Sequence, residues 1–260
     1  MCKIIAKVEK PEALENIDEI IAATDAVMVA RGDLAIEIPA ENVPSIQKQL
    51  IKRCIERRKI VITATQMLHT MIENPRPTRA EVSDIANAIY DGTDAIMLSG
   101  ESAIGKYPVE AVETMSRIAS RIEGQVDRKE LVKRANKAKG SRAIETSIAV
   151  SVAYTVIQSK VSLIIVPTMS GSTAKYLSKY RPDAKILALT SSAKNARGLQ
   201  LHSCVEPIEF PLSTDTESVV KEAIAIAKKD HGIKKGDRVI ITGGFPIGAP
   251  TNGMRIIDIK

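Results

Sequence analysis

The sequence KIIAKVE at residues 3–9 opens a series of four short apolar runs that decides the fold. The other three runs are DAVMVA at 25–30, KIVITAT at 59–65 and DAIMLS at 94–99. Amphipathic stretches separate them, such as VPSIQKQLIKRCIERR at 43–58, whose apolar residues recur at helical spacing. Apolar side chains on both sides of each run are typical of parallel strands covered on both faces. The pattern predicts four strand-then-helix units, in a (β/α) barrel or in a doubly wound sheet.

A charged segment separates this part of the sequence from a second one. At residues 122–140 the apolar periodicity fades while lysine and arginine accumulate, which predicts a helical linker. We therefore expect one domain at 1–121 and another at 141–260. The second domain opens with a long amphipathic helix at 141–159, and five apolar runs follow, at 163–168, 185–190, 205–210, 238–244 and 254–260. This alternation predicts a smaller three-layer α/β domain.

The composition limits the classes of function. The chain has 260 residues, of which 44% are hydrophobic, as in globular proteins. Its net charge of +6 is small and dispersed, and aromatic residues are only 3%, so we expect no nucleic-acid partner. No apolar run approaches the roughly 18 residues that span a bilayer, so we expect no membrane partner. The odd number of cysteines, at Cys2, Cys54 and Cys204, predicts no disulfide framework and favours the cytoplasm.

Charged side chains lie at the carboxyl ends of the first two predicted strands. Lys7 and Glu9 are two residues apart, so they point to the same face of the strand. After the second strand, Gly32 allows close approach of a ligand to the backbone, and Asp33 supplies another carboxylate. Two carboxylates at neighbouring strand ends suit a hard divalent cation. A structural ion pair between Lys7 and Glu9 is the alternative interpretation.

The next two strands end in further polar residues on the same expected rim. Thr65 and Gln66 follow the third strand, and Ser99, Gly100 and Glu101 follow the fourth. Hydroxyl groups at such positions are also common as helix caps or turn residues. The rim of parallel strands nevertheless predicts that all four strand ends contribute to one site.

Longer motifs give the sequence a resemblance to the pyruvate kinase family over essentially its whole length. In the first part these motifs are IIAKVE at 4–9, VMVARGDLAIEIP at 27–39, TATQML at 63–68 and NPRPTRAEVSDIANAIYDGTDAIMLSGESAIGKYP at 74–108. In the second part they are SIAVSVAYT at 147–155, TMSGSTA at 168–174, YRPDAKILALT at 180–190 and GGFPIGAPTNGMRI at 243–256.

The resemblance implies a fold and an activity. The fold would be the second half of a TIM (β/α)8 barrel, followed by the α/β regulatory domain of the family. The activity would be transfer of a phosphoryl group from phosphoenolpyruvate to ADP in glycolysis, giving pyruvate and ATP. The family is further expected to need Mg²⁺ or Mn²⁺ together with K⁺, and to form a cytoplasmic homotetramer.

The resemblance also assigns roles to the rim residues. Lys7 would stabilise the transferring phosphoryl group and the enolate, while Glu9 and Asp33 would bind the divalent metal. The backbone at Gly32 and Asp33 would bind the carboxylate of the substrate. Thr65 would lie beside the enolate carbon.

Ser99 and Glu101, by the same resemblance, would lie on the proton-relay side of the pocket.

Parts of the family pattern have no counterpart in this sequence. The resemblance begins at the fifth barrel strand, so the first four strands, the lid domain, the phosphate-holding arginines and the potassium site are not represented. We expect a fragment or an incomplete gene product, with two unpaired sheet edges open to association and no activity by itself. Half-barrels that assemble between chains are the alternative.

A loop in the second domain is a candidate anion site. Small and hydroxyl residues precede a predicted helix, where free backbone amides and the helix dipole favour anions; they are Thr168, Ser170, Gly171, Ser172 and Thr173. The resemblance implies that this loop receives the phosphate of a sugar-phosphate or nucleotide effector, and that the loop at 243–252 faces it. Simple helix capping by Ser172 or Thr173 is the alternative.

Two other functions fit parts of the sequence. A metal-dependent aldolase or lyase acting on pyruvate-like acids would also place carboxylates after neighbouring barrel strands, but it explains neither TATQML nor IMLSGE, nor the second domain. A non-catalytic module that binds phosphorylated metabolites would suit a half-barrel. The presence of Lys7, Glu9 and Asp33 instead indicates catalytic ancestry.

Overall fold

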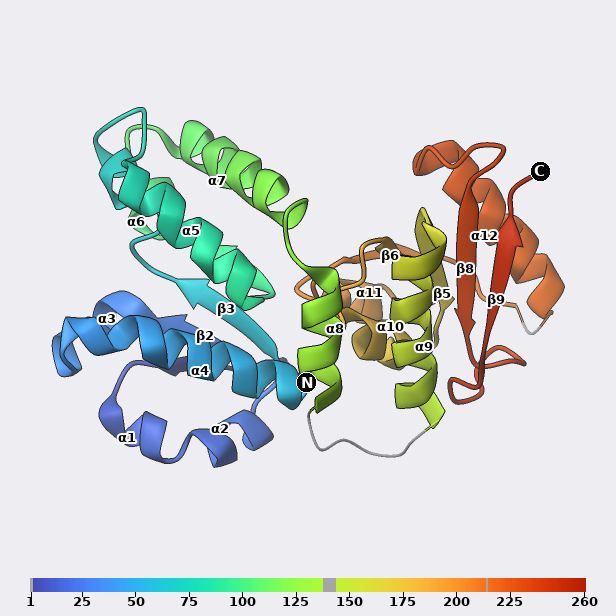
Figure 1. Cartoon of the computed structure of the whole chain (residues 1–260), viewed down its shortest axis with the longest axis horizontal. Helices are drawn as coiled ribbons and strands as arrows, with labels where there is room; N and C mark the ends of the chain where they lie inside the picture. The colour runs from blue at the N-terminus through green and yellow to red at the C-terminus, as the bar shows by residue number, and fades with distance from the viewer. Residues whose placement is uncertain (1, 138–143, 214) are drawn as a thin grey trace. The chain divides into compact units, whose positions relative to one another are not determined.

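The computed structural model describes residues 2–137, 144–213 and 215–260. The chain forms two compact units that divide between Val126 and Asp127, and each is described by itself (Figure 1). Residues 138–140 of the predicted linker and 141–143 of the predicted long helix lie outside the described residues.

The first unit is built on a parallel sheet with the order β1-β2-β3-β4. The strands are β1 (Ile5–Val8), β2 (Ala26–Ala30), β3 (Ile60–Ala64) and β4 (Ala95–Met97), one in each of the four apolar runs. Within this sheet β1, β2 and β3 each pair with the strand that follows in the chain. A doubly wound sheet reverses its strand order at a switch point, and β1–β4 have no such reversal. The sheet therefore has the succession of a (β/α) barrel.

Helices cover one face of this sheet. Buried Val27, Val29 and Val61 pack against Leu50 and Ile51 of α4. The opposite face carries small and apolar side chains that pack with one another: Ala26, Met28, Ile60, Ile62, Ala95 and Met97. The helices of the unit are α1 (Pro11–Glu15), α2 (Ile17–Ala23), α3 (Arg31–Glu37), η1 (Ala40–Asn42), α4 (Val43–Glu56), η2 (His69–Ile72), α5 (Arg79–Asp91), α6 (Gly100–Ala103) and α7 (Pro108–Glu123).

The second unit contains a five-stranded sheet with the order β7-β6-β5-β8-β9. Its strands are β5 (Leu163–Pro167), β6 (Lys185–Thr190), β7 (Val205–Glu209), β8 (Arg238–Gly243) and β9 (Gly253–Asp258). Only the β8–β9 pair among them is antiparallel. The strand order reverses at β5, which pairs with β6 on one side and β8 on the other. This sheet is therefore of the doubly wound type.

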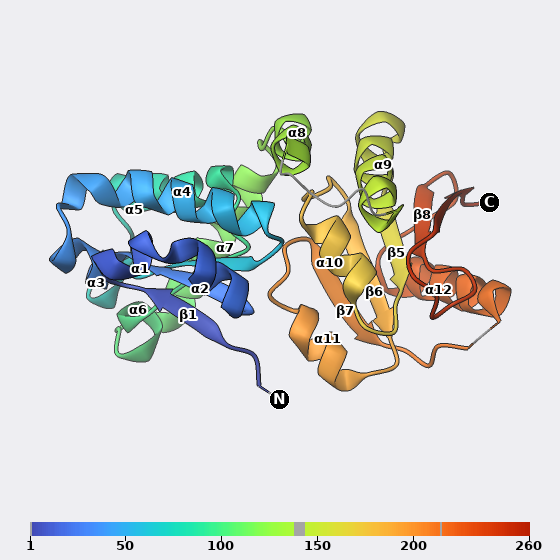
Figure 2. The ribbon, with the colours of Figure 1, turned by 90° about the horizontal axis from the view of Figure 1, so that it is seen from below.

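Helices lie on both faces of the second sheet. Leu163 and Ile165 of β5 pack towards Val219 and Ala223 of α12 (Thr216–Asp230). Alternate residues of β5 point the other way and are also buried, on the side of α9 and α10 (Figure 2). The remaining helices of the unit are α8 (Arg128–Lys137), α9 (Ile144–Ser159), α10 (Ser172–Ser178) and α11 (Ala193–Leu199). The three-layer α/β fold is confirmed.

The charged segment at 122–140 contains a packed helix. Leu131, Val132 and Ala135 of α8 are buried, and α8 packs against α9 within the second unit. The apolar residues of α8 therefore form a buried stripe, which the overall composition of the segment conceals. The domain limits at 121 and 141 remain predictions.

Among the described residues, no helix is both long and apolar enough to cross a membrane.

Candidate active site

The structure brings Lys7, Glu9 and Asp33 together at the carboxyl ends of β1 and β2. Lys7 lies in β1, Glu9 follows it, and Asp33 lies in the first turn of α3, directly after β2. The Nζ atom of Lys7 forms an ion pair with Oε1 of Glu9 and lies 3.8 Å from Oδ2 of Asp33. The prediction that Lys7 and Glu9 lie on the same face is confirmed. The parallel pairing of β1 with β2 brings Asp33 beside them.

The charges of this cluster reinforce one another. The hydrogen bond to Glu9, with its negative charge, raises the pKa of the Lys7 ammonium. Reciprocally, the hydrogen bond from Lys7, together with its positive charge, lowers the pKa of the Glu9 carboxyl group against the opposing effect of desolvation. All three side chains are open to solvent, with exposed fractions of 54% for Lys7, 34% for Glu9 and 51% for Asp33. Solvent therefore screens their mutual attraction.

Glu9 and Asp33 form a suitable but incomplete oxygen donor set for a divalent cation. Mg²⁺ is commonly held by one or two protein carboxylates, with water and substrate oxygens as the other ligands. The described residues contain no group of three acidic, histidine or cysteine side chains that could hold a metal ion. The pair therefore fits Mg²⁺ or Mn²⁺ only if other oxygens share the ion.

Thr65 lies at the end of β3 in a left-handed backbone conformation. Its φ is +69°, and the φ of the next residue, Gln66, is +54°. The backbone N–H of Gly32 donates to Oγ1 of Thr65 over 2.7 Å, and this hydroxyl donates to the carbonyl of Ala64, also over 2.7 Å. A Cβ atom at Gly32 would lie 3.3 Å from Oγ1 of Thr65, so glycine suits this close approach. The structure thus brings two predicted site residues into direct contact.

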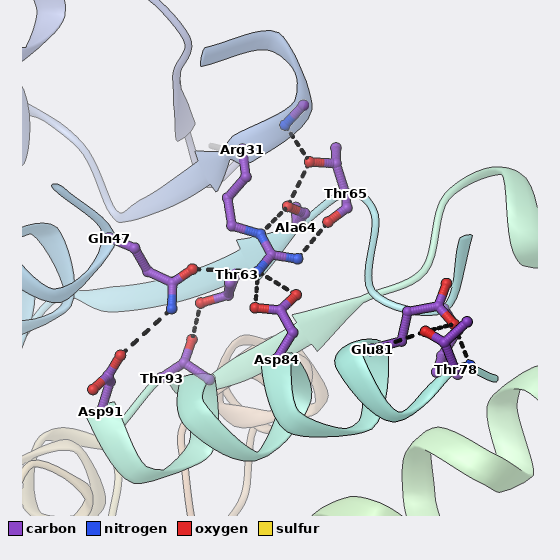
Figure 3. A network of polar contacts seen from close by, with 12 residues as sticks. Arg31, Gln47, Thr63, Ala64, Thr65, Thr78, Glu81, Asp84, Asp91 and Thr93 are labelled. Atoms are coloured by element: carbon purple, nitrogen blue, oxygen red, sulfur yellow. Dashed lines mark hydrogen bonds and ion pairs between the residues drawn. The ribbon is translucent and has the colours of Figure 1, made fainter. Parts of the chain in front are cut away.

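Arg31, for which no sequence pattern indicated a role, contacts the backbone beside Thr65 from the interior of the unit. Arg31 is 8% exposed, and its guanidinium donates to Asp84 and to the carbonyl oxygens of Ala64 and Thr65 (Figure 3). The position of Arg31 directly after an apolar run could have indicated a buried ion pair, since a charged residue is rarely buried without a partner. Its partner on α5 could not be read from spacing alone.

Ser99 and Glu101 lie after β4, and the carboxylate of Glu101 is engaged with the backbone. Glu101 is 1% exposed. Its Oε1 accepts from the N–H of Leu68 over 3.0 Å, and its Oε2 accepts from the N–H of Ser99 over 2.8 Å. Glu101 therefore ties the loop after β3 to the loop after β4. Among the described residues, no hydrogen bond or ion pair joins Ser99 to Lys7 or Glu9.

The loop at 168–173 in the second unit begins α10 without a side-chain cap. The N-cap residue is Gly171, whose φ is +80°, and neither Ser172 nor Thr173 caps the helix. Thr168 accepts from the N–H of Gly171, while Thr173 shares a 2.7 Å hydrogen bond with Thr251.

The hydroxyl-bearing residues of this loop thus have two environments. Ser170 and Ser172 are exposed, whereas Thr168 and Thr173 are buried. The contact with Thr251 joins the loop to the segment at 243–252, as expected.

The fold and the rim residues define a class of protein. The first unit has successive parallel strands in barrel order, with a lysine and two carboxylates at one rim, and the second is a separate doubly wound domain. Two family models match these units: "Pyruvate kinase, barrel domain" matches residues 1–112, and "Pyruvate kinase, alpha/beta domain" matches residues 146–257. The chain belongs to the pyruvate kinase family.

Individual relatives agree with this family. The chain is 49% identical over 256 residues to a pyruvate kinase of Geobacillus stearothermophilus, a match that covers 98% of this chain and 43% of the relative. It is 48% identical over 259 residues to a pyruvate kinase of Clostridium perfringens, covering 99% of this chain and 54% of the relative.

A solved structure gives the same result. The crystal structure of a pyruvate kinase from Cryptosporidium parvum matches with a TM-score of 0.94 at 39% identity, over 99% of this chain and 52% of that chain. The chain thus spans about half the length of the relatives it matches.

Proposed function

We propose that the whole protein transfers a phosphoryl group from phosphoenolpyruvate to ADP, giving pyruvate and ATP. The observation that carries this proposal is the meeting of Lys7, Glu9 and Asp33 at the carboxyl ends of β1 and β2. Phosphoryl transfer depends mainly on positioning and on stabilising negative charge, so a fixed ammonium group beside two carboxylates is suitable apparatus.

Each rim residue then has a specific task. Lys7 places its ammonium group opposite the negative charge that develops on the phosphoryl group and the enolate. Glu9 and Asp33 would hold Mg²⁺ or Mn²⁺, which supplies positive charge to the phosphate oxygens. The backbone at Gly32 and Asp33 would bind the carboxylate of the substrate, which would share the N–H of Gly32 with the Thr65 hydroxyl. Thr65 would lie beside the enolate carbon.

Ser99 is proposed on the proton-relay side of the pocket. For Glu101 the geometry favours a supporting task, because both carboxylate oxygens accept backbone N–H groups.

We infer that the 260-residue chain has no such activity by itself. Its Lys7 and Asp33 side chains are about half exposed, whereas charge stabilisation is most effective in a pocket that excludes water. The relatives are about twice as long, and the additional length would supply the remaining rim, the phosphate-holding groups and the ligands of K⁺. A cytoplasmic homotetramer is part of the same proposal.

The test compares the chain with a completed barrel. We define the fusion enzyme as the amino-terminal part of the Geobacillus stearothermophilus relative joined to this chain at the corresponding position. A coupled lactate dehydrogenase assay should detect pyruvate formation with the fusion enzyme and none with the chain. Size-exclusion chromatography should accompany it. Turnover by a monomer of the chain would contradict the account of its inactivity, and a folded but inactive fusion enzyme would contradict the proposed function.

The second unit is proposed to bind a phosphorylated effector at the loop 168–173. Ser170 and Ser172 offer exposed hydroxyl groups at the start of α10, whose N-cap residue, Gly171, has no side chain. The Ser170 hydroxyl donates to that of Ser172 and accepts from the N–H of Ser172 over 3.4 Å. The bond between Thr173 and Thr251 fixes the neighbouring segment against the loop. Such an arrangement suits a phosphate group.

A further inference from the structure

The guanidinium of Arg31 connects the end of β2 to the end of β3. Arg31 is the residue directly after β2, and its side chain is almost completely buried. Its Nε donates to the carbonyl of Ala64 over 3.3 Å, and its Nη2 donates to the carbonyl of Thr65 over 2.6 Å. The same side chain therefore holds two successive peptide groups of the loop after β3.

The carbonyl groups of Ala64 and Thr65 lie on either side of the left-handed backbone of Thr65, a conformation that has to be stabilised. A left-handed φ is unfavourable for a β-branched residue such as Thr65, and such conformations persist only where the surroundings fix them. In this conformation Oγ1 of Thr65 accepts the N–H of Gly32. Release of the Thr65 carbonyl would thus allow the hydroxyl to leave Gly32.

Asp84 fixes the guanidinium in turn. The Nη1 atom of Arg31 lies 2.6 Å from both carboxylate oxygens of Asp84, on α5, and 3.4 Å from Oε1 of Gln47, on α4 (Figure 3). The planar fork of arginine can satisfy a carboxylate and two carbonyls at once, which the single ammonium group of lysine cannot do with the same geometry.

We propose that Arg31 is a positioning residue, which, anchored by Asp84, holds Thr65 in its left-handed conformation so that its hydroxyl meets Gly32 at the substrate pocket. The catalytic part of this proposal rests on the proposed function. Among the described residues, the hydrogen bonds of Arg31 go to protein groups outside the rim cluster of Lys7, Glu9 and Asp33, so it acts through Thr65.

The first test uses the chain itself and needs no activity. Hydrogen exchange of the Gly32 amide, followed by NMR, reports the bond to Thr65. Arg31→Lys keeps a charge beside Asp84 but loses the fork, and the double variant Arg31→Met with Asp84→Leu removes both charges so that neither is left buried alone. Gly32 should exchange at least tenfold faster in both variants, while the amides of β2 keep their protection.

The matched control is Lys48→Gln. Lys48 forms an ion pair with Asp91, so it also joins α4 to α5, but its own side chain is exposed. Lys48→Gln removes this ion pair and should leave the exchange rate of the Gly32 amide within twofold of the rate in the parent. If circular dichroism shows that the Arg31 variants are folded and Gly32 still exchanges as in the parent, the proposal is wrong.

The second test uses the fusion enzyme. Arg31→Lys should lower kcat and raise the KM for phosphoenolpyruvate, each about tenfold, with the KM for ADP unchanged. If Arg31 had only a structural role, Arg31→Lys would lower the amount of folded enzyme without this selective change in kcat and in the KM for phosphoenolpyruvate. Unchanged kinetics despite faster exchange would overturn the catalytic part of the proposal. If the folded parent fusion is inactive, the proposed function fails, while the exchange measurement still decides whether Arg31 positions Thr65.

Discussion

The hydroxyl oxygen of Thr65 lies 2.7 Å from the backbone nitrogen of Gly32, which joins the end of β3 to the first turn of α3. Thr65→Val keeps the shape of the side chain but removes this acceptor. In the fusion enzyme we expect kcat/KM for phosphoenolpyruvate to fall at least tenfold, and we expect a loss of about 1 kcal/mol in unfolding free energy. Thr65→Ser, which retains the hydroxyl, is the control. Equal kinetics for Val and Ser variants would contradict a role for the hydroxyl.

Lys7 should be essential for turnover and dispensable for folding. In the fusion enzyme, Lys7→Met should lower kcat by several orders of magnitude, because the ammonium group serves the transition state. Its side chain is 54% exposed, so the urea midpoint should not change. Lys3→Met, which removes an exposed lysine paired with Asp25, is the control and should keep full activity. Activity of the Lys7 variant within tenfold of the parent would exclude the assigned role.

Glu9 and Asp33 should determine the metal requirement. Replacement of either by Ala in the fusion enzyme should raise the Mn²⁺ concentration needed for half-maximal activity at least tenfold, since each removes one of two carboxylate ligands. Glu12→Ala removes an exposed carboxylate on the neighbouring helix and should leave the titration unchanged. Unaltered Mn²⁺ titrations in both variants would argue against these residues as ligands.

Glu81 should make the stability of the first unit depend on acidic pH. Burial alone would raise its pKa, but hydrogen bonds from Thr70 and Thr78 outweigh burial and hold the pKa below its ordinary value of 4.5. The stabilisation is therefore present above pH 4.5 and is lost as the pH falls through the lowered pKa. Glu81→Gln should cost about 1 to 2 kcal/mol at pH 7.

Urea unfolding at several pH values tests this prediction. The difference between the parent and Glu81→Gln should shrink as the pH falls below 4.5, and a difference that stays constant with pH would contradict it. Glu110→Gln, on the exposed surface of α7, is the control variant.

The loop at 168–173 should bind a phosphorylated metabolite. Calorimetry on the whole chain with fructose 1,6-bisphosphate, AMP and ribose 5-phosphate should give heat with at least one of them, and binding should weaken with added salt. Replacement of Ser170 and Ser172 by Ala should weaken binding at least tenfold. Ser218→Ala on α12 is the control. Absence of heat with all three compounds would exclude the loop as a site for them.

The sequence predicted the strands well because their signal is local. Each apolar run of the first unit contains one strand, and the polar residues at the strand ends follow from the same alternation. The order of the strands needed the structure, since periodicity is the same in a barrel and in a doubly wound sheet. Helix α8 was assigned to a linker because its charged residues outnumber the three buried apolar ones.

The supporting residues of the site could not be predicted in the same way. The pairing of Arg31 with Asp84 joins residues on different elements, and no spacing rule connects them. The position of Glu101 after β4 followed from the sequence, but its two backbone partners depend on how the loops after β3 and β4 fold together. Such contacts are tertiary, and a single sequence carries little information about them.

The strand order of the two units has a consequence for how each of them forms. In the first sheet each neighbouring pair is formed by strands that follow one another in the chain, so every pairing closes only the connection between two successive strands. In the second sheet the central strand β5 must also find β8, with Leu163 beside Val239. Long-range pairings of this kind slow folding. During synthesis β1 to β4 can therefore pair strand by strand, whereas the second sheet stays incomplete until β8 and β9 have been made.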